Sequence, residues 1–421
     1  MQVKIFPSQP RGTLRIPSSK SIAHRAILCA CLAEGTSLIT HVDRNRDVMA
    51  TIACMKALGA DIRIKEEGIE ITGTNGAGLS SDIVCPCDES GSTLRFVLPL
   101  ASLSRQKVTF TGRGRLMQRP MDVYQKIFEE QSLSFVQKDS ITIQGALQAG
   151  RYELPGDVSS QFITGLLMAC PLMKEDSTII VRPPFESRSY VDLTLSVLAD
   201  FGITVEQKDN TFFIKGNQQY QPRTYSVEGD DSQMAFFATW AALNQPLQLK
   251  GCRKDSLQGD HVICSLLEQA GAKVTQTEAF ITIQPGSGQA IQADLGNCPD
   301  LGPILFVLAS YLTGTSTFTS IRRLRLKESD RVAAMEEELR KWGVQIQSQE
   351  DRLTITGKET YRSDSVVTMH SHNDHRIAMA MTVFGLCAQS PSCLLQAEAV
   401  NKSYPEFFKD IQKLQGKVET I

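Results

Sequence analysis

Apolar stretches that begin after polar residues and end at glycine run along the whole chain. The first, residues 26–33, follows Ser19-Lys20-Ser21 and stops at Glu34-Gly35. Serine is a common helix N-cap and glycine a common C-cap, so the pattern predicts a helix that starts near Ser19 and is capped by Gly35. Apolar and polar residues alternate over residues 1–7, which predicts a strand ahead of this helix.

A longer pattern of helix end, glycine, strand, polar turn and second strand occurs six times. Glycine follows the helix at positions 59, 202, 271, 343 and 416, and Gln131 occupies that position in a weaker copy. The period is roughly 70 residues, as expected for a repeated structural unit. Upstream in each copy a polar cap leads into an apolar helix, at Ser19-Lys20, Ser90-Gly91, Ser159-Ser160, Asp230-Asp231, Pro299-Asp300 and Asn373-Asp374. The sequence therefore predicts an α/β protein of six βαβαββ units.

Three copies on either side of about residue 225 predict two similar domains, as does the length of 421 residues. The C-terminus cuts the last copy short, and the N-terminal strand would complete it. One domain would then be residues 1–18 with 228–421, and the other residues 19–227. If the capped helices of a domain point the same way, their N-termini share a face of positive potential. Helices that merely pack together would give the same period.

The composition, with 42% hydrophobic and 21% charged residues, is that of a soluble globular protein. A net charge of −2 supplies no overall basic field, so we expect no nucleic-acid partner, and an anion site has to be a local gathering of cations. We expect no membrane segment and no targeting peptide, because no apolar run is long enough and the first strand pattern starts at once. The eleven cysteines lie mostly in apolar segments, which favours reduced thiols in a cytoplasmic protein.

Positive charge gathers at several predicted helix starts. Lys20 and Arg25 follow Ser19, where free N–H groups and the helix dipole favour an anion. Lys327 and Arg331 are four residues apart and would share a helix face, where an anion would offset their repulsion. Each segment taken alone is equally typical of solvated surface cations. Further cations lie at Arg113, Arg115, Arg119, Arg376 and Lys402.

Histidines at positions 370, 372 and 375 could suggest a metal, but no suitably spaced carboxylate or cysteine completes a ligand set. Asn373 or Asp374 as a helix N-cap, with Arg376 in the first turn, fits an anion site better. We therefore expect no metal. The sequence also lacks a Walker A loop, a dinucleotide glycine fingerprint and a nucleophile elbow.

Nine segments, in collinear order over nearly the whole chain, resemble the motifs of 5-enolpyruvylshikimate-3-phosphate synthase (3-phosphoshikimate 1-carboxyvinyltransferase). They are Ser19-Lys20-Ser21 with Arg25, Glu89-Ser90-Gly91-Ser92-Thr93-Leu94-Arg95, Arg115-Leu116-Met117-Gln118-Arg119-Pro120, Val158-Ser159-Ser160-Gln161, Val227-Glu228-Gly229-Asp230, Pro299-Asp300, Leu326-Lys327-Glu328-Ser329-Asp330-Arg331, Asn373-Asp374-His375-Arg376 and Asn401-Lys402. The resemblance implies two domains of three βαβαββ units each, in the inside-out α/β barrel of the enolpyruvyl transferases, with a cleft between them.

The resemblance also implies a reaction. The enolpyruvyl group of phosphoenolpyruvate would pass to the 5-hydroxyl of shikimate 3-phosphate with release of phosphate, in the shikimate pathway to chorismate and aromatic amino acids. The enzyme would be a monomer without cofactor or metal, and a target of glyphosate, for which Gly91 leaves room. Both substrates are anionic, so a site with several cations suits them. The reaction needs an acid and a base that act on different atoms, so two carboxyl groups with different pKa values suit it. We expect the domains to close on the ligands and exclude water.

Roles follow from the same motif matches. The implied catalytic groups are Asp300, which takes the hydroxyl proton, and Glu328, aided by Lys20, which protonates the methylene carbon. Shikimate 3-phosphate would be held by Ser21, Arg25, Ser159, Ser160, Gln161, Ser187, Asp300 and Lys327. Phosphoenolpyruvate would be held by Lys20, Gly91, Arg119, Gln161, Arg331, Arg376 and Lys402.

Three positions depart from the usual motifs, namely Ser18, Glu89 and Arg323. Glu89 would repel a bound phosphate unless it turns toward an arginine such as Arg95. Two alternatives stay open. The related UDP-N-acetylglucosamine enolpyruvyl transferase is a poorer match, because residues 113–119 contain no cysteine and serine follows Lys20. A non-catalytic anion-binding protein of the same fold is the other.

Overall fold

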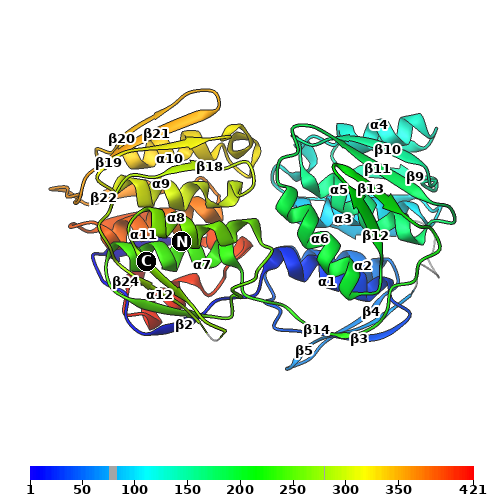
Figure 1. The fold of residues 1–421 in the computed structure, drawn as a ribbon, viewed down its shortest axis with the longest axis horizontal. Helices are drawn as coiled ribbons and strands as arrows, with labels where there is room; N and C mark the ends of the chain where they lie inside the picture. Colours follow the sequence, from blue (N-terminus) through cyan, green and yellow to red (C-terminus); the bar gives the residue numbers. More distant parts are fainter. Residues whose placement is uncertain (75–82, 279) are drawn as a thin grey trace. The chain divides into compact units, whose positions relative to one another are not determined.

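The computed structural model describes residues 1–74, 83–278 and 280–421, which form two compact units. Unit 1 contains Met1–Pro17 and Gly229–Ile421, and unit 2 contains Ser18–Glu228 (Figure 1). These boundaries lie one residue from the expected positions. Each unit has its own hydrophobic core, so each is described separately.

Unit 2 is built from alternating helices and short strands. Its helices are α1 (Lys20–Leu32), α2 (Arg46–Ala57), α3 (Gly91–Ser102), η1 (Leu116–Gln118), α4 (Asp122–Glu130), α5 (Ser160–Ala169), η2 (Cys170–Leu172) and α6 (Arg188–Asp200). Its strands are β3 (Gly35–Thr40), β4 (Asp61–Ile64), β5 (Gly68–Gly73), β6 (Ile83–Pro86), β7 (Val108–Thr111), β8 (Ser134–Gln137), β9 (Ile141–Gln144), β10 (Arg151–Pro155), β11 (Ser177–Arg182), β12 (Val205–Lys208), β13 (Thr211–Ile214) and β14 (Thr224–Ser226).

Unit 1 has the same alternation. Its helices are α7 (Asp231–Leu243), η3 (Gly259–Val262), α8 (Ile263–Gln269), η4 (Pro299–Leu301), α9 (Gly302–Ser310), η5 (Arg322–Leu326), α10 (Arg331–Arg340), α11 (His375–Cys387), η6 (Ala397–Lys402) and α12 (Phe407–Lys413). Its strands are β1 (Gln2–Phe6), β2 (Thr13–Arg15), β15 (Leu247–Lys250), β16 (Lys273–Gln276), β17 (Ile281–Gln284), β18 (Gln292–Asp294), β19 (Gly314–Thr319), β20 (Gln345–Ser348), β21 (Arg352–Gly357), β22 (Val367–His370), β23 (Ser392–Leu395) and β24 (Lys417–Thr420).

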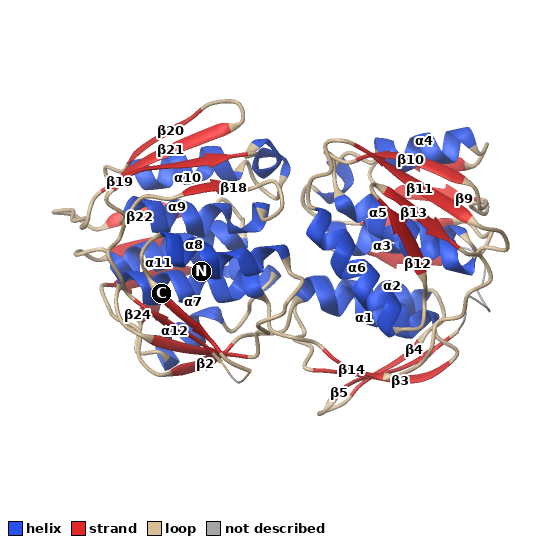
Figure 2. Ribbon diagram, in the orientation of Figure 1, coloured by secondary structure: helices blue, strands red, loops and turns tan. Residues whose placement is uncertain are grey.

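Across the described residues the strands form six four-stranded sheets of one design. In the order β10-β11-β13-β12, the first two strands are parallel and the last two pair antiparallel. The first helix of each repeat is mostly buried, and every residue of α9 is buried. The second helix is amphipathic and half exposed, as in α10. Figure 2 shows the sheets flanking the helices of each unit. The predicted α/β repeat is confirmed.

The N-terminal strand completes the last repeat, as predicted, because β1 pairs with both β23 and β24. The sequence pattern did not reveal that, in two other sheets, the first strand comes from a part of the chain outside the rest of its repeat. β14 is the first strand of the sheet that holds β3, β4 and β5, although it follows them in sequence. β2 likewise pairs with β15. Three-residue strands are too short to show an alternation of apolar and polar residues.

Three predicted caps are wrong in detail. Helix α1 ends at Leu32 with Ala33 as its C-cap, and Gly35, at φ 118°, is the first residue of β3. In the two weaker repeats the left-handed residue after the helix is Ser132 (φ 56°) or Gln415 (φ 68°), one position from the predicted 131 and 416. The position after the C-cap needs a positive φ, and without glycine there a polar residue adopts it at some cost.

None of the described helices has the length and hydrophobicity needed to cross a membrane. All eleven cysteines are free thiols, as predicted, and nine of them are buried. Polar residues begin the buried helices as the sequence indicated. Ser90, Ser159, Asp230 and Asp374 each accept a hydrogen bond from a backbone N–H in the first turn of α3, α5, α7 or α11.

Candidate active site

Asp300 is the centre of a charged cluster at the helix starts of unit 1. One carboxylate oxygen accepts a hydrogen bond from Arg331 Nη1 at 2.8 Å and lies 3.3 Å from Lys327 Nζ. The other accepts one from Arg376 Nη2 at 3.2 Å. Asp300 lies in η4 just before α9, Arg331 is the first residue of α10, and Arg376 is the second residue of α11. Three chain segments that are distant in sequence thus meet at one carboxylate.

The charges of this cluster shift one another's pKa values. Burial would raise the pKa of Asp300, but Arg376, Lys327 and Arg331 together hold it well below the ordinary value. Burial lowers the pKa of Lys327 to about 8, although the Asp300 carboxylate opposes that shift. Asp300 is therefore ionised at neutral pH, and Lys327 loses its proton at mildly alkaline pH.

Lys327 does not share a helix face with Arg331, which corrects the prediction from their spacing. Asp330 is the N-cap of α10, so the helix begins only at Arg331, and Lys327 has an extended backbone after η5. An aspartate at the N-cap accepts from Ala333 N and stops the helix from extending backward. The two cations nevertheless meet at Asp300.

Asp374 links α10 to α11. It caps α11 by accepting from Arg376 N at 2.9 Å, and it accepts from Arg331 Nε at 2.9 Å and Ser329 Oγ at 3.1 Å. Burial would raise the pKa of Asp374, but the Arg331 guanidinium more than offsets this and lowers it. Arg331 is thereby held between two carboxylates, while Nε and Nη1 of Arg376 are buried without a hydrogen-bond partner among the described residues. Unsatisfied buried guanidinium donors favour an anionic ligand.

Glu328 and Lys402 lie against the segment that precedes α11. The Oε2 atom of Glu328 is 3.0 Å from Nδ1 of the buried His375, and Lys402 Nζ donates to the Asn373 carbonyl at 2.8 Å. His375 was not among the predicted site residues, although it lies in the Asn373–Arg376 motif. Ligand atoms of Glu328, Asp374 and His375 lie within 4.8 Å of one another. The Asp374 oxygens are already occupied by Arg331, Ser329 and the helix N-terminus, which disfavours a metal here.

In unit 2, the start of α3 brings together three of the motif segments. A Cβ atom on Gly91 would lie 2.6 Å from Arg119 Nη1, 3.6 Å from Arg95 Nη1 and 3.7 Å from Gln161 Oε1. Arg95 Nη1 donates to Gln161 Oε1 at 2.7 Å, and Gln161 Nε2 donates to Ser92 Oγ at 2.9 Å. The predicted Gly91, Arg119 and Gln161 are therefore neighbours. Arg95 joins them and was not among the predicted site residues, although it lies in the same motif.

Lys20, the first residue of α1, forms an ion pair with Asp47 of α2 at 2.9 Å. No sequence motif had indicated Asp47. Arg25 is buried and donates to Thr194 Oγ1, the Ser21 carbonyl and the Tyr190 carbonyl, at 2.7–2.9 Å. These bonds place its guanidinium between α1 and α6. The remaining predicted serines lie at helix starts, with Ser21 in the first turn of α1, Ser159 and Ser160 at the start of α5, and Ser187 before α6.

The structure shows which groups lie near Glu89 and Arg323, two of the residues that depart from the usual motifs. The Glu89 carboxylate lies 3.1 Å from the position of a Cβ on Gly114, so this side chain lies against the arginine-bearing loop after β7. Arg323 is close enough to Lys327 to contribute to the lowering of its pKa.

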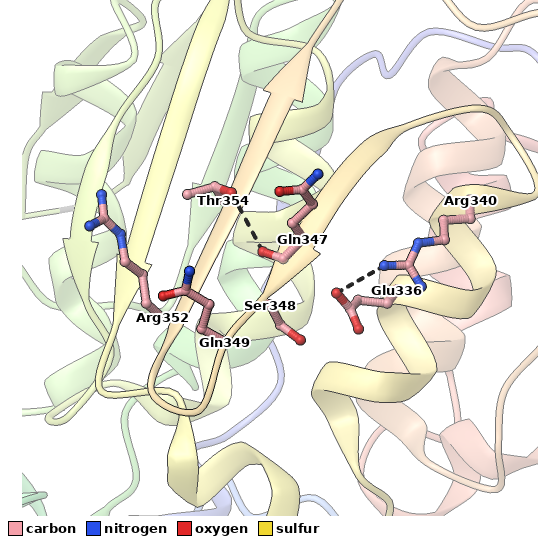
Figure 3. A pocket seen from close by; sticks show the side chains of 7 residues that line it. All are labelled: Glu336, Arg340, Gln347, Ser348, Gln349, Arg352 and Thr354. Carbon is pink, nitrogen blue, oxygen red and sulfur yellow. Dashed lines mark hydrogen bonds and ion pairs between the residues drawn. The ribbon is translucent and has the colours of Figure 1, made fainter.

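A pocket of about 480 Å³ lies elsewhere in unit 1, beside α10 and the β20–β21 hairpin (Figure 3). Its lining residues are Glu336, Arg340, Gln347, Ser348, Gln349, Arg352 and Thr354. Arg340 is paired with Glu336 at 3.2 Å, and no predicted site residue lines the pocket. Two other groups of residues are therefore better candidates for an active site. They are the charged residues around Asp300 in unit 1, and Gly91 with Arg95, Arg119 and Gln161 in unit 2.

Comparisons with known proteins agree with the motif resemblance. The family model of EPSP synthase (3-phosphoshikimate 1-carboxyvinyltransferase) matches residues 6–411. The 3-phosphoshikimate 1-carboxyvinyltransferase of Clostridium kluyveri is 41% identical over 421 residues, covering 99% of this chain and 98% of the relative. That of Clostridioides difficile is 39% identical over 430 residues, with the same coverage.

Solved structures support the fold. EPSP synthase from Acinetobacter baumannii matches with a TM-score of 0.83 at 25% identity, covering 100% of both chains. The enolpyruvyl transferase NikO from Streptomyces tendae matches with a TM-score of 0.79 at 14% identity, covering 99% of this chain and 98% of that chain, which shows the fold alone. By its sequence, repeat architecture and motifs, this chain belongs to the EPSP synthase (3-phosphoshikimate 1-carboxyvinyltransferase) family.

Proposed function

We propose that this chain transfers the enolpyruvyl group of phosphoenolpyruvate to the 5-hydroxyl of shikimate 3-phosphate and releases phosphate. Membership of the EPSP synthase family supports the reaction, which leads to chorismate and the aromatic amino acids. The hydroxyl oxygen gives up its proton and bonds to C2 of phosphoenolpyruvate while C3 takes a proton and becomes a methyl group, and the tetrahedral intermediate then loses a C3 proton and phosphate. The proposed reaction needs neither a metal nor a cofactor.

The observation that carries the proposal is the buried Arg376 guanidinium beside Asp300, whose Nε and Nη1 atoms have no hydrogen-bond partner in the described part of the chain. Arg376 and Arg331 would bind the carboxylate of phosphoenolpyruvate, since guanidinium groups match its planar geometry. Its phosphate would be held by Lys20, Gly91, Arg119 and Lys402. At Gly91, a Cβ atom would lie only 2.6 Å from Arg119 Nη1, so a larger residue would require this guanidinium to shift away from its place beside Gly91.

Shikimate 3-phosphate would be held by groups of both units. Ser21, Arg25, Ser159, Ser160 and Ser187 lie at helix starts of unit 2, where N–H groups and hydroxyls suit a phosphate. Lys327 and Asp300 of unit 1 would bind the same substrate, and Gln161 would contact both ligands. We further propose that the two units are the two domains of the enzyme, so that substitutions in either one abolish turnover.

Asp300 would be the base and Glu328 the acid. With its three cations, Asp300 is ionised but weakly basic, because its pKa lies well below the ordinary value. When substrate anions engage Arg331 and Arg376, they compete with Asp300 for these cations and raise its basicity toward the working pH. Glu328, aided by Lys20, would deliver the proton to the methylene carbon. Holding both reactants in place can supply about 7–11 kcal/mol of the barrier reduction.

The test is phosphate release by the purified full chain from phosphoenolpyruvate and shikimate 3-phosphate together. Lys20→Ala and Glu328→Ala are expected to lose turnover, each in a different unit. Lys215→Ala and Glu350→Ala are matched controls at exposed side chains. Turnover with UDP-N-acetylglucosamine in place of shikimate 3-phosphate, or tight substrate binding without any turnover, would contradict the proposal.

Three finer properties belong to the same proposal. The enzyme would be a cytoplasmic protein and a monomer, which light scattering of the purified chain can check. It would also be inhibited by glyphosate in competition with phosphoenolpyruvate, because Gly91 carries no side chain that would crowd the phosphate-binding groups.

A further inference from the structure

Glu338 is a fully buried carboxylate in the middle of α10, outside the groups proposed to touch substrate. It accepts hydrogen bonds from His370 N at 2.9 Å, from His372 Nε2 at 2.8 Å, and from Lys341 Nζ at 2.8 Å. Burial would raise the pKa of Glu338, but these donors lower it, so the carboxylate is ionised. Two of its three partners, His370 and His372, belong to residues 370–376, which run from the last residue of β22 into the first turn of α11.

This connecting segment, residues 370–376, has an unusual backbone. His372 and Asn373 both have left-handed conformations, with φ of 51° and 53°. Two consecutive non-glycine residues in this region cost about 1–2 kcal/mol each and persist only where surrounding contacts impose them. The contacts with Glu338 lie at and just before the first of them. His370 Nδ1 accepts from His372 N at 2.9 Å and tightens the same turn.

The same segment supplies the groups that shape the candidate site of unit 1. The Asn373 carbonyl accepts from Lys402, Asp374 accepts from Arg331, and Arg376 donates to Asp300. His375 contacts Glu328. A change in the backbone at His372 would therefore displace the groups proposed to bind phosphoenolpyruvate, and shifts of about 1 Å in such groups can cost about 10²-fold in rate.

We infer that Glu338 is a positioning residue. By accepting hydrogen bonds from His370 N and the His372 imidazole, it holds the left-handed turn at His372 and Asn373. This turn places Arg376 and the Asn373 carbonyl, which accepts from Lys402, for the binding of phosphoenolpyruvate. The assignment rests on the proposed function for the identity of that ligand. A cation site formed by Glu337, Glu338 and His372 is the competing interpretation of this cluster. Lys341 Nζ lies within 2.9 Å of both Glu338 oxygens and already supplies the positive charge.

The test compares steady-state kinetics of Glu338→Ala, Glu338→Gln and His372→Asn with wild type, using the full chain. Asparagine tolerates the left-handed backbone, so His372→Asn removes the imidazole alone. Glu337→Gln is the matched control, because this neighbouring glutamate is exposed. We expect Glu338→Ala to raise KM for phosphoenolpyruvate about 10-fold or more and to leave KM for shikimate 3-phosphate within about twofold. Glu338→Gln keeps an acceptor for His370 N, so its KM for phosphoenolpyruvate should lie between those of Glu338→Ala and wild type. Glu337→Gln should have the kinetics of wild type.

A merely structural role gives a different result, since loss of folded protein lowers kcat and leaves both KM values unchanged. That result, or unchanged kinetics in Glu338→Ala and His372→Asn, overturns the inference. If Glu338→Ala does not fold, the other two variants decide by the same criterion. Calorimetric titration of phosphoenolpyruvate alone, with shikimate 3-phosphate omitted so that no reaction runs, repeats the comparison without turnover. Absence of turnover in wild type would count against the proposed function. The ratio of the phosphoenolpyruvate Kd values of Glu338→Ala and wild type would still test the positioning role of Glu338.

Discussion

Arg376 and Asp300 form an ion pair of 3.2 Å in which the guanidinium uses only part of its hydrogen-bonding capacity. Its Nη2 also donates to Ser232 Oγ at 2.9 Å, whereas Nε and Nη1 are buried and unsatisfied among the described residues. Burial would lower the pKa of Arg376, but Asp300 and other nearby carboxylates raise it. The pair thus combines a permanent cation that can bind an anion with a carboxylate whose basicity depends on that anion.

Asp300→Asn should remove the base and keep the shape of the site. We expect kcat to fall by about 10²–10⁴-fold, with a smaller change in KM for phosphoenolpyruvate, because proton abstraction is lost while Arg331 and Arg376 remain. Initial rates of phosphate release at saturating substrates measure the effect. A variant that retains more than a tenth of wild-type kcat would remove Asp300 from the catalytic role.

Asp374→Asn should mainly destabilise unit 1. It leaves the buried Arg331 with Asp300 as its carboxylate partner, and breaking a buried pair costs about 3–5 kcal/mol. We expect a loss at the lower end of this range, since one partner remains. Urea unfolding measures the loss. Asp330→Asn is the control, because asparagine is an equally good N-cap for α10 and should change stability little. Equal stability of both variants would show that the Arg331–Asp374 pair is not important for folding.

Gly91→Ala should weaken phosphoenolpyruvate and glyphosate together. The new methyl group would lie 2.6 Å from Arg119 Nη1, which forces the guanidinium to move. We expect the inhibition constant of glyphosate to rise at least tenfold, and KM for phosphoenolpyruvate to rise less. Inhibition assays at several phosphoenolpyruvate concentrations test this. Ser92→Ala is unsuitable as a control because Ser92 contacts Gln161, so Ser104→Ala, just beyond the end of α3, serves instead.

The pKa of Lys327 predicts an alkaline limit for shikimate 3-phosphate. Because the folded pKa is about 8 and that of an ordinary lysine is 10.5, the unfolded chain binds more protons between these values. Raising the pH through this window therefore removes the free-energy cost of burying the charged ammonium group and favours folding. It also removes the cation that would bind the substrate, so kcat/KM for shikimate 3-phosphate should fall above about pH 8.

Lys327→Arg keeps its charge at alkaline pH and should move this limit upward. A pH profile of kcat/KM for both proteins checks the prediction. An unchanged alkaline limb in the arginine variant would assign it to another group.

Much of the architecture could be predicted from local patterns. The period of the repeats, the N-cap residues and the completion of the last sheet by β1 all follow from apolar spacing and cap chemistry near each element. The errors lie where these signals are weak, at the three-residue strands β2 and β14 and at the Ser132 and Gln415 turns that lack glycine.

The site was predicted through its motifs as a set of residues, but their relations were not. Arg331 and Asp300 are 31 residues apart and Arg376 and Asp300 are 76 apart, so only the packing of η4, α10 and α11 decides that one carboxylate meets both. Asp47, the partner of Lys20, and Glu338, the partner of His372, carry no local signal for the same reason.

Local sequence patterns were enough to predict the repeated α/β units, the helix starts and the family, because caps and apolar periods act over a few residues and the motifs are contiguous. Tertiary structure alone decided which charges pair, which guanidinium donors stay unsatisfied and how far the pKa values of Asp300 and Lys327 move. Those properties depend on burial and on distances between residues far apart in the chain, and Coulomb and desolvation energies respond to both.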